Sequence, residues 1–284
     1  MDFQLSEEQE LFRKSVRDFV GREVAPVAAV LDERGEFPMA LFRRCGELGY
    51  FGLRYPEAVG GMGADFTTFC LMAEEIARGS LSLAAAVSMQ CLMGTDFVYR
   101  FGTDDHKTRL LASALRGEKI GTIAMTEPDF GSDLGGITTR AVKDGDGWVL
   151  TGRKMWITSA TVADFFTVAA KTGPEAGFKG IDMFLVEREM PGLTVGKRIE
   201  KMGVRASETS ELILESVRVP AAISASTRCS CSLSMAKAAV SSAWAAHRTL
   251  ANTRSVSEGS SSAWPWATAC RARTTSRPPA CFNT

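Results

Sequence analysis

Glu127 and Asp133 are the side chains of this 284-residue chain that first suggest chemistry, because two neighbouring carboxyl groups can share the roles of general acid and general base. The two histidines, His106 and His247, lie far apart in the sequence, so neither a Ser-His-Asp triad nor a histidine-based metal site is predicted. We expect His106 to be a solvated residue in the first turn of a helix. Enzyme chemistry must therefore come from carboxylates or from a cofactor.

Nucleotide-binding and metal-binding motifs are missing from the sequence. No G-x-G-x-x-G follows a strand pattern and no G-x-x-x-x-G-K-[ST] occurs, so neither a Rossmann site nor a P-loop is predicted. Cys229-Ser230-Cys231 does not have the spacing of a zinc knuckle. Seven cysteines, an odd number, indicate reduced thiols, and the acidic start lacks an apolar targeting segment. We expect a cytoplasmic protein without a metal or a membrane anchor.

The charge balance conceals two unlike parts. Lys and Arg number 33, as do Asp and Glu, which argues against a surface adapted to nucleic acid. Residues 222–284 nevertheless carry a net charge of +6 and residues 1–221 carry −6. Ser, Thr and Ala supply 34 of the last 63 residues, and no helical or strand periodicity runs through them. This tail is expected not to fold.

Helical patterns fill the first third of the chain. Ser6 to Gln9 form a capping box, and apolar residues then recur at three- and four-residue spacing. Five further helices are predicted, at Val24–Leu31, Met39–Leu48, Thr67–Ala77, Leu81–Tyr99 and Asp104–Leu115. The apolar run Leu81–Met93 is judged too short to span a bilayer.

Strand patterns replace helices after Gly117. The predicted strands are Ile120–Met125, Gly147–Thr151, Phe165–Ala169, Ile181–Val186, Leu193–Val195 and Leu212–Val219. Short strands without intervening helices favour a small antiparallel barrel or sandwich, and we take the barrel as the expected form. The expected fold is thus α+β and multidomain, with an N-terminal helical domain over 1–117, a middle β-barrel domain over 118–221 and an atypical tail over 222–284.

Three segments carry a specific resemblance to a known family. They are Ala124–Gly136 (AMTEPDFGSDLGG), Gly152–Ala160 (GRKMWITSA) and Lys201–Leu212 (KMGVRASETSEL). In this order and spacing they resemble the acyl-CoA dehydrogenase family of FAD-dependent flavoproteins. The resemblance covers about residues 1–221 and ends just after Pro220.

The resemblance implies a cofactor, a reaction and partners. Family members bind FAD between the β domain and a C-terminal four-helix bundle, and they oxidise an acyl-CoA thioester to the trans-2-enoyl-CoA. Electrons then pass to an electron-transferring flavoprotein, and the intact enzyme is a homotetramer. Two alternatives stay open: a non-catalytic remnant that retains flavin or subunit binding, and an acyl-CoA oxidase with the same flavin loop.

The resemblance also assigns site residues. It implies that FAD contacts Met125, Thr126, Gly131, Ser132, Trp156, Ile157 and Thr158. Thr126 and Thr158 match positions at the edge of the flavin ring, Trp156 matches the aromatic residue beside it, and Ser132 matches a residue that touches both the FAD pyrophosphate and the substrate's pantetheine arm. Taken singly, a strand threonine, a core tryptophan and a Gly-Ser-Asp turn would each have an ordinary structural explanation.

Other residues of these motifs have implied supporting roles. In the family, Glu127 and Asp133 shape the loop and are not the base, and Lys201 and Arg205 organise a second loop. Phe130 stands where the family usually has a small residue. Its ring could narrow the pocket or turn outward, and one hypothesis is that it restricts the choice of acyl chain.

The catalytic base has no counterpart in this sequence. In the family it is a glutamate of the C-terminal bundle, whereas the tail offers only Glu258 in a context that does not match. We hypothesise that residues from about 222 onward are a frameshifted translation, and the competing explanation is a genuine disordered basic tail. No catalytic residue is therefore assigned, and the length and branching of the acyl chain stay open.

Overall fold

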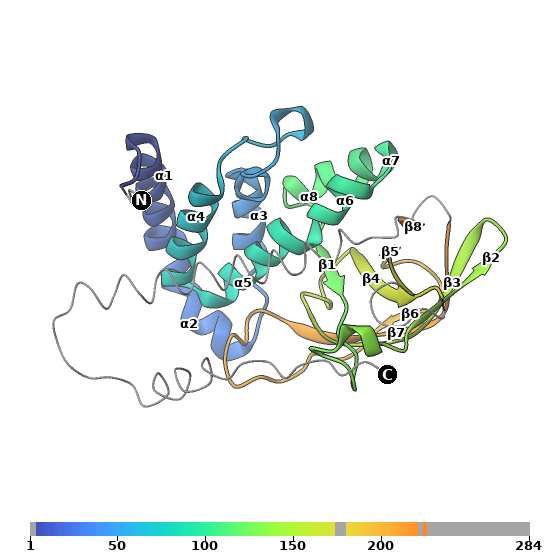
Figure 1. Cartoon of the computed structure of the whole chain (residues 1–284). Coiled ribbons are helices and arrows are strands. Elements are labelled where there is room, and N and C mark those ends of the chain that lie inside the picture. The colour runs from blue at the N-terminus through green and yellow to red at the C-terminus, as the bar shows by residue number, and fades with distance from the viewer. Residues whose placement is uncertain (1–3, 174–179, 221–223, 226–284) are drawn as a thin grey trace, which may run out of the picture. The chain divides into compact units, whose positions relative to one another are not determined.

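The computed structural model of the chain describes residues 4–173, 180–220 and 224–225. They belong to one compact unit, residues 1–231. Helices occupy the first part of this unit and strands the second (Figure 1). The predictions for the tail beyond residue 225 lie outside the described residues.

Eight α-helices and five short helical turns precede the first strand of the described chain. The α-helices are α1 (Glu7–Phe19), α2 (Ala25–Arg34), α3 (Met39–Glu47), α4 (Phe66–Gly79), α5 (Leu81–Met89), α6 (Asp96–Phe101), α7 (Asp104–His106) and α8 (Ala112–Leu115). Three π-helical turns, η1 (Val20–Val24), η4 (Gln90–Gly94) and η5 (Lys107–Leu111), and two 3₁₀ turns, η2 (Tyr50–Gly52) and η3 (Glu57–Val59), lie between them.

Local sequence signals account for the first helices. The capping box is present, since the Ser6 hydroxyl accepts a hydrogen bond from the Gln9 amide at 3.2 Å and the Gln9 side chain accepts one from the Ser6 amide at 3.1 Å. The first two predicted helices are joined, because the π-helical turn Val20–Val24 carries the chain directly into α2. Pro26 lies just after this turn, where its missing N–H is tolerated.

One apolar helical stretch, Leu81–Phe101, has 21 residues and meets the length and hydropathy of a membrane span. It extends eight residues beyond Leu81–Met93, the run that was predicted to be too short to span a bilayer. Within its most apolar window 56% of the residues are buried inside the fold, among them Leu83 and Val87. That burial is typical of a core helix, which needs no membrane to cover it.

His106 is buried, with 5% of its surface exposed, so the prediction of a solvated residue is wrong. Its Nδ1 accepts a hydrogen bond from the Thr103 amide, while the Thr103 hydroxyl accepts one from the His106 amide, both at 3.3 Å. Burial, and then the nearby Arg109 guanidinium, lower the pKa of His106. The imidazole therefore serves as a helix cap.

The strands in the described part of the chain form one eight-stranded sheet. They are β1 (Gly121–Ala124), β2 (Arg140–Asp144), β3 (Gly147–Thr158), β4 (Phe165–Lys171), β5 (Ile181–Glu187), β6 (Leu193–Val195), β7 (Thr209–Val219) and β8 (Ser224–Ala225). The hydrogen-bonded order is β6-β7-β3-β2-β4-β5-β8, and β1 pairs with β4. Pairing is antiparallel except for β1 with β4 and a single contact of β2 with β4.

The sheet differs from the predicted strands in three places. β2 was not predicted, because Arg140–Asp144 is exposed at most positions and lacks a clear alternation. β3 runs seven residues beyond the predicted end at Thr151 and pairs with β7 along most of this length. β8 lies within the tail that was expected not to fold, so that expectation is wrong for Ser224 and Ala225.

Helices and sheet pack closely where η4 meets β1. A methyl group on Gly94 would lie 2.2 Å from the carbonyl oxygen of Gly121, so both backbones need a glycine there. The buried Gln90 side chain accepts a hydrogen bond from the Gly121 amide and donates to the carbonyls of Ala114 and Lys119. These contacts fix the start of β1, whose far end leads to the candidate site.

Candidate functional site

The candidate site begins where the chain leaves β1 and runs beside β3. The Met155 amide donates to the Thr126 carbonyl at 2.9 Å, and the Lys154 ammonium donates to the Met125 carbonyl at 3.1 Å. The structure therefore brings the Met125-Thr126 segment against the middle of β3. The side chains of Met125 and Thr126 are half-buried.

Trp156 is the most unusual residue of this strand. It lies in an irregular part of the pairing with β7, between Lys154 and Ile157, and has a left-handed φ of 62°. Such a backbone is costly for a bulky residue, so the surrounding strand must enforce it. The side chain is 56% exposed although it is a large aromatic. An aromatic face is thus held out from the sheet beside the end of β1.

The next two residues of β3, Ile157 and Thr158, offer different groups to a ligand. The side chain of Ile157 is buried in the main core, so only its main chain is available to a ligand. Thr158 is half-buried, and its carbonyl accepts a hydrogen bond from the Thr122 hydroxyl at 2.8 Å. That bond ties the end of β3 to β1, the strand that precedes the Met125-Thr126 segment.

A buried ion pair lies directly behind this arrangement. The Lys154 ammonium contacts a Glu127 carboxylate oxygen at 2.9 Å, and the two residues are 0% and 3% exposed. Glu127 also accepts hydrogen bonds from the amides of Thr138 and Thr139 at 2.6 and 2.9 Å and from the Thr138 hydroxyl at 2.7 Å. The carboxylate therefore joins the two ends of the loop between β1 and β2.

The hydrogen bonds of Glu127 determine its charge. Burial alone would raise the pKa of this carboxyl, but the bonds from Lys154, Thr139 and Thr138 outweigh burial and lower the pKa from 4.5 to about 2. Burial lowers the pKa of Lys154, and Glu127 opposes that shift. Each charge is therefore stabilised by the other across the ion pair. Glu127 is thus fully used in holding the loop.

The loop between Glu127 and Thr138 carries the remaining predicted cofactor residues. Glu127 and Phe130 exchange backbone hydrogen bonds of 2.9 and 3.2 Å, which makes a tight turn. Gly131, Ser132 and Asp133 follow and are exposed, and the chain then enters the 3₁₀ turn η6 (Leu134–Gly136). The Asp133 side chain makes no capping bond to this turn.

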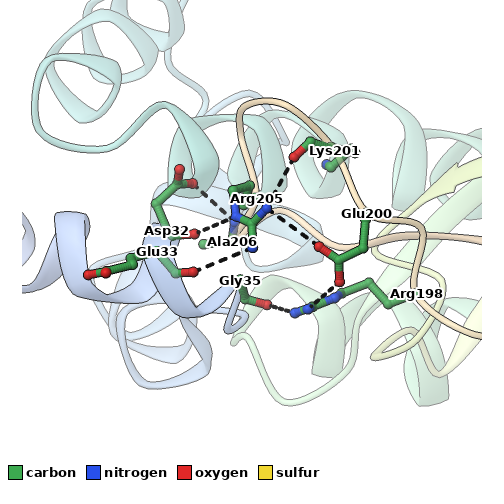
Figure 2. A network of polar contacts seen from close by, with 8 residues as sticks. All are labelled: Asp32, Glu33, Gly35, Arg198, Glu200, Lys201, Arg205 and Ala206. Atoms are coloured by element: carbon green, nitrogen blue, oxygen red, sulfur yellow. Dashed lines mark hydrogen bonds and ion pairs between the residues drawn. The ribbon is translucent and has the colours of Figure 1, made fainter.

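The second predicted loop, Lys201 to Arg205, is held against the C-terminal end of α2 (Figure 2). The Arg205 guanidinium donates to the carbonyls of Asp32 and Glu33 at 3.3 and 3.5 Å and to the Lys201 carbonyl at 3.4 Å. Lys201 donates to the Ser207 carbonyl and to the Thr209 hydroxyl. Both cations therefore organise the loop.

Asp32 completes this network from the helical side. Its carboxylate accepts a hydrogen bond from the Ser82 hydroxyl at 2.6 Å. It also accepts one from the Ala206 amide at 3.1 Å (Figure 2). The Ser82 bond is the main cause that lowers the pKa of Asp32. The loop preceding β7 is thereby tied to α2 and α5.

The structure gathers the predicted site residues in two groups. Met125 and Thr126 lie beside the β3 segment that bears Trp156, Ile157 and Thr158. Gly131 and Ser132 lie on the exposed loop that Glu127 ties back to Thr138 and Thr139. Sequence reasoning missed the Lys154 partner of Glu127, and the available signal was a lysine at an inward-facing position of a strand.

The comparisons with known proteins agree with this architecture. The acyl-CoA dehydrogenase N-terminal domain family matches residues 6–118, and the acyl-CoA dehydrogenase middle domain family matches residues 122–217. Benzylmalonyl-CoA dehydrogenase of Aromatoleum aromaticum is 52% identical over 220 residues, which are 78% of this chain and 58% of that protein. The chain thus spans less than two thirds of this relative's length.

Solved structures show the same similarity. A glutaryl-CoA dehydrogenase in complex with glutaryl-CoA has a TM-score of 0.77 and 36% identity, covering 80% of this chain and 58% of that one. A glutaryl-CoA dehydrogenase from Mycobacterium smegmatis in complex with FADH2 has a TM-score of 0.73 and 35% identity, with 78% and 55% covered.

The helical part and the curled β half-barrel that follows it are the N-terminal and middle domains of a flavoprotein oxidoreductase. The chain belongs to the acyl-CoA dehydrogenase family, whose members are FAD-dependent enzymes. The fold predicted from the sequence is confirmed for these two domains, with a half-barrel in place of a closed barrel.

Proposed function

We propose that this chain is an acyl-CoA dehydrogenase by family, whose middle domain binds FAD and presents it to an acyl-CoA thioester, and that dehydrogenation is impaired because the family's catalytic glutamate has no counterpart in this sequence. The observation that carries the proposal is the exposed, left-handed Trp156 beside the Met125-Thr126 segment. The product would be the trans-2-enoyl-CoA, and the electrons would pass to an electron-transferring flavoprotein. Assembly as a homotetramer belongs to the same proposal, as does a cytoplasmic location.

The residues present fit a flavin nucleotide. An aromatic side chain that is 56% exposed offers a wall for a planar ring system, and two half-buried threonines, Thr126 and Thr158, offer hydroxyl donors beside it. A methyl group on Gly131 would have no atom of the described residues within 4 Å, so these residues leave the space above this loop open to a ligand. Bound FAD would supply the acceptor for the substrate's hydride.

Each residue then has a defined task. Thr126 and Thr158 would hydrogen-bond the edge of the ring where negative charge develops, and Trp156 would exclude water from one side of it. Ser132 would hydrogen-bond the pyrophosphate and the pantetheine arm from the exposed loop. Gly131 would let the backbone approach these groups closely. These tasks are to bind, to orient and to exclude water.

Proton abstraction is not assigned to the described residues. Glu127 is unsuited as a base, because its carboxylate is buried, charge-paired and bonded to two amides, and its pKa is lowered to about 2. The resemblance implies that the catalytic glutamate lies in a C-terminal helical bundle, beyond the matched residues. The proposal for residues 4–220 is therefore one of cofactor and substrate positioning.

The experiment is an FAD titration of the purified full chain, followed by anaerobic addition of acyl-CoA thioesters. We expect FAD to bind and Thr126→Val to weaken binding by about tenfold, which corresponds to one lost hydrogen bond to a charged group. Thr151→Val is the matched control, because Thr151 is an exposed threonine of β3 that is not among the proposed cofactor residues. Equal affinities for both variants and the wild type would contradict the proposed site.

The same titration separates the alternatives. Bleaching of the flavin by acyl-CoA, with slow recovery in air, supports the dehydrogenase. Rapid recovery in air would indicate an acyl-CoA oxidase, since oxygen would then reach the reduced flavin. Flavin binding without bleaching would indicate a non-catalytic remnant.

A further inference from the structure

Phe130, which interrupts the family's usual loop sequence, is placed by the structure on Gly136. A methyl group on Gly136 would lie 2.4 Å from both Cδ1 and Cε1 of the Phe130 ring. The ring therefore rests directly against the backbone of Gly136, at a distance that only a glycine permits. Residues 131–135 form an arc whose two ends meet at this contact.

The ring belongs to a small apolar cluster apart from the main core. Its buried members are Ile137, Ala169 and Ile181, and the half-buried residues packed against them are Met125, Phe130, Leu134 and Met183. The cluster lies under the arc and includes Met125 from the end of β1. The contact between Phe130 and Gly136 is thus continuous with the Met125-Thr126 segment that follows β1.

Backbone hydrogen bonds close the same arc. Glu127 and Phe130 are bonded in both directions at its start. At its end the Gly136 amide donates to the Asp133 carbonyl at 3.1 Å and the Ile137 amide donates to the Leu134 carbonyl at 3.3 Å. Gly131, Ser132 and Asp133, between these bonds, are exposed and receive no support from the cluster. Their order depends on how firmly the base of the arc is held.

We propose that Phe130 is a positioning residue, which closes the arc across Gly136 and holds Ser132 and its neighbouring amides ready for a pyrophosphate-bearing ligand. The proposal rests on the proposed function, because it takes FAD to be that ligand. A loop held in its binding conformation loses less conformational entropy on binding, so the ring increases affinity without touching the ligand. Packing against Gly136 favours this role over selection of the acyl chain.

The test measures two properties of the full chain, the hydrogen exchange of the Gly136 and Ile137 amides and the dissociation constant for FAD. In Phe130→Ala we expect exchange of both amides to rise by about tenfold, since their local opening is no longer opposed by the ring. The dissociation constant for FAD is expected to rise by about five- to tenfold. Phe130→Leu keeps an apolar side chain in the cluster and serves as the variant less prone to misfold. Its exchange rates and its dissociation constant for FAD should lie between those of the wild type and of Phe130→Ala.

Substitution of Gly136, the residue against which the Phe130 ring packs, tests whether the effect depends on this contact. Gly136→Ala should accelerate exchange in the wild-type background, because its methyl group collides with Phe130. In the Phe130→Ala background the same substitution should have a much smaller effect, since the collision is gone. Additive effects would show that the two residues act independently and would overturn the proposal.

The remaining outcomes are equally decisive. Unchanged exchange in Phe130→Ala would overturn the closure of the arc. Faster amide exchange in Phe130→Ala with an unchanged dissociation constant for FAD would overturn the positioning role, because the ring would then only stabilise the loop by packing. A wild-type chain that binds no FAD would refute the proposed function and the choice of ligand, while the exchange data would still decide whether Phe130 closes the arc.

Discussion

Replacing Lys154 by methionine tests how the flavin loop is held. Lys154 is fully buried, and its ammonium contacts Glu127 and the Met125 carbonyl. Methionine is similar in length but has no charge, so the variant leaves the Glu127 carboxylate buried with its amide partners alone. Breaking a buried ion pair by removing one partner costs about 3–5 kcal/mol. Apolar packing of the methionine offsets a part, so we expect a loss of about 3–4 kcal/mol.

The assay is urea unfolding of the full chain, arranged as a double-mutant cycle. Glu127→Gln is expected to cost about 2–4 kcal/mol, because it leaves the ammonium without a counter-charge. The double variant should cost about 3 kcal/mol, well below the sum of the single losses, since neither charge remains. Lys143→Met is the matched control: Lys143 is an exposed lysine of β2, and its loss should cost less than about 0.5 kcal/mol.

Two results would refute this reasoning. One is a loss below about 1 kcal/mol for Lys154→Met, which would mean that the ammonium is solvated or absent from the site. The other is additivity of the two single variants, which would mean that Lys154 and Glu127 do not interact.

Three further predictions follow from the same structure. The folded-state pKa of Glu127 is lowered to about 2, so the contribution of its carboxylate to the free energy of unfolding is complete above about pH 4.5 and is lost as the pH falls towards 2. The stability difference between wild type and Glu127→Gln, measured by unfolding at a series of acid pH values, should therefore shrink as the pH falls. A difference that grows would contradict the lowered pKa. Gly94→Ala should lower stability in urea by about 1–3 kcal/mol, because its methyl group would lie 2.2 Å from the Gly121 carbonyl oxygen, and an unchanged midpoint would contradict that packing. Glu75→Gln should lower the free energy of unfolding by about 1.5–3 kcal/mol in thermal or urea unfolding. The Glu75 carboxylate is 2% exposed and receives two hydrogen bonds from Arg17, at 2.5 and 3.0 Å. An unchanged stability would mean that the pair is solvated.

The helices were predictable because their signals are local. Ser6 to Gln9 mark the first helix, and the apolar spacing of Asp104–Leu115 gives the bounds of the last helical stretch as observed. The burial of His106 was not predictable, since it depends on how that stretch packs in the fold. Leu81–Phe101 is likewise a core helix because of its neighbours and not because of its length.

The residues of the candidate site were predicted from the resemblance, whereas their arrangement in space was not. The motifs around Thr126 and Trp156 place both residues near the cofactor by resemblance, whereas the exposed left-handed Trp156 requires the irregular pairing of β3 with β7. The Lys154–Glu127 pair joins positions 27 residues apart, and a sequence pattern does not tell which lysine meets which glutamate. The closeness of Phe130 to Gly136 is similarly a product of the loop's conformation.

The proposed FAD site of the middle domain is tested by the flavin content of the purified full chain after incubation with FAD and gel filtration. We expect flavin to elute with the protein at close to one equivalent, and Trp156→Ala to release most of it. A folded wild-type chain that elutes without flavin would show that the middle domain holds no FAD site.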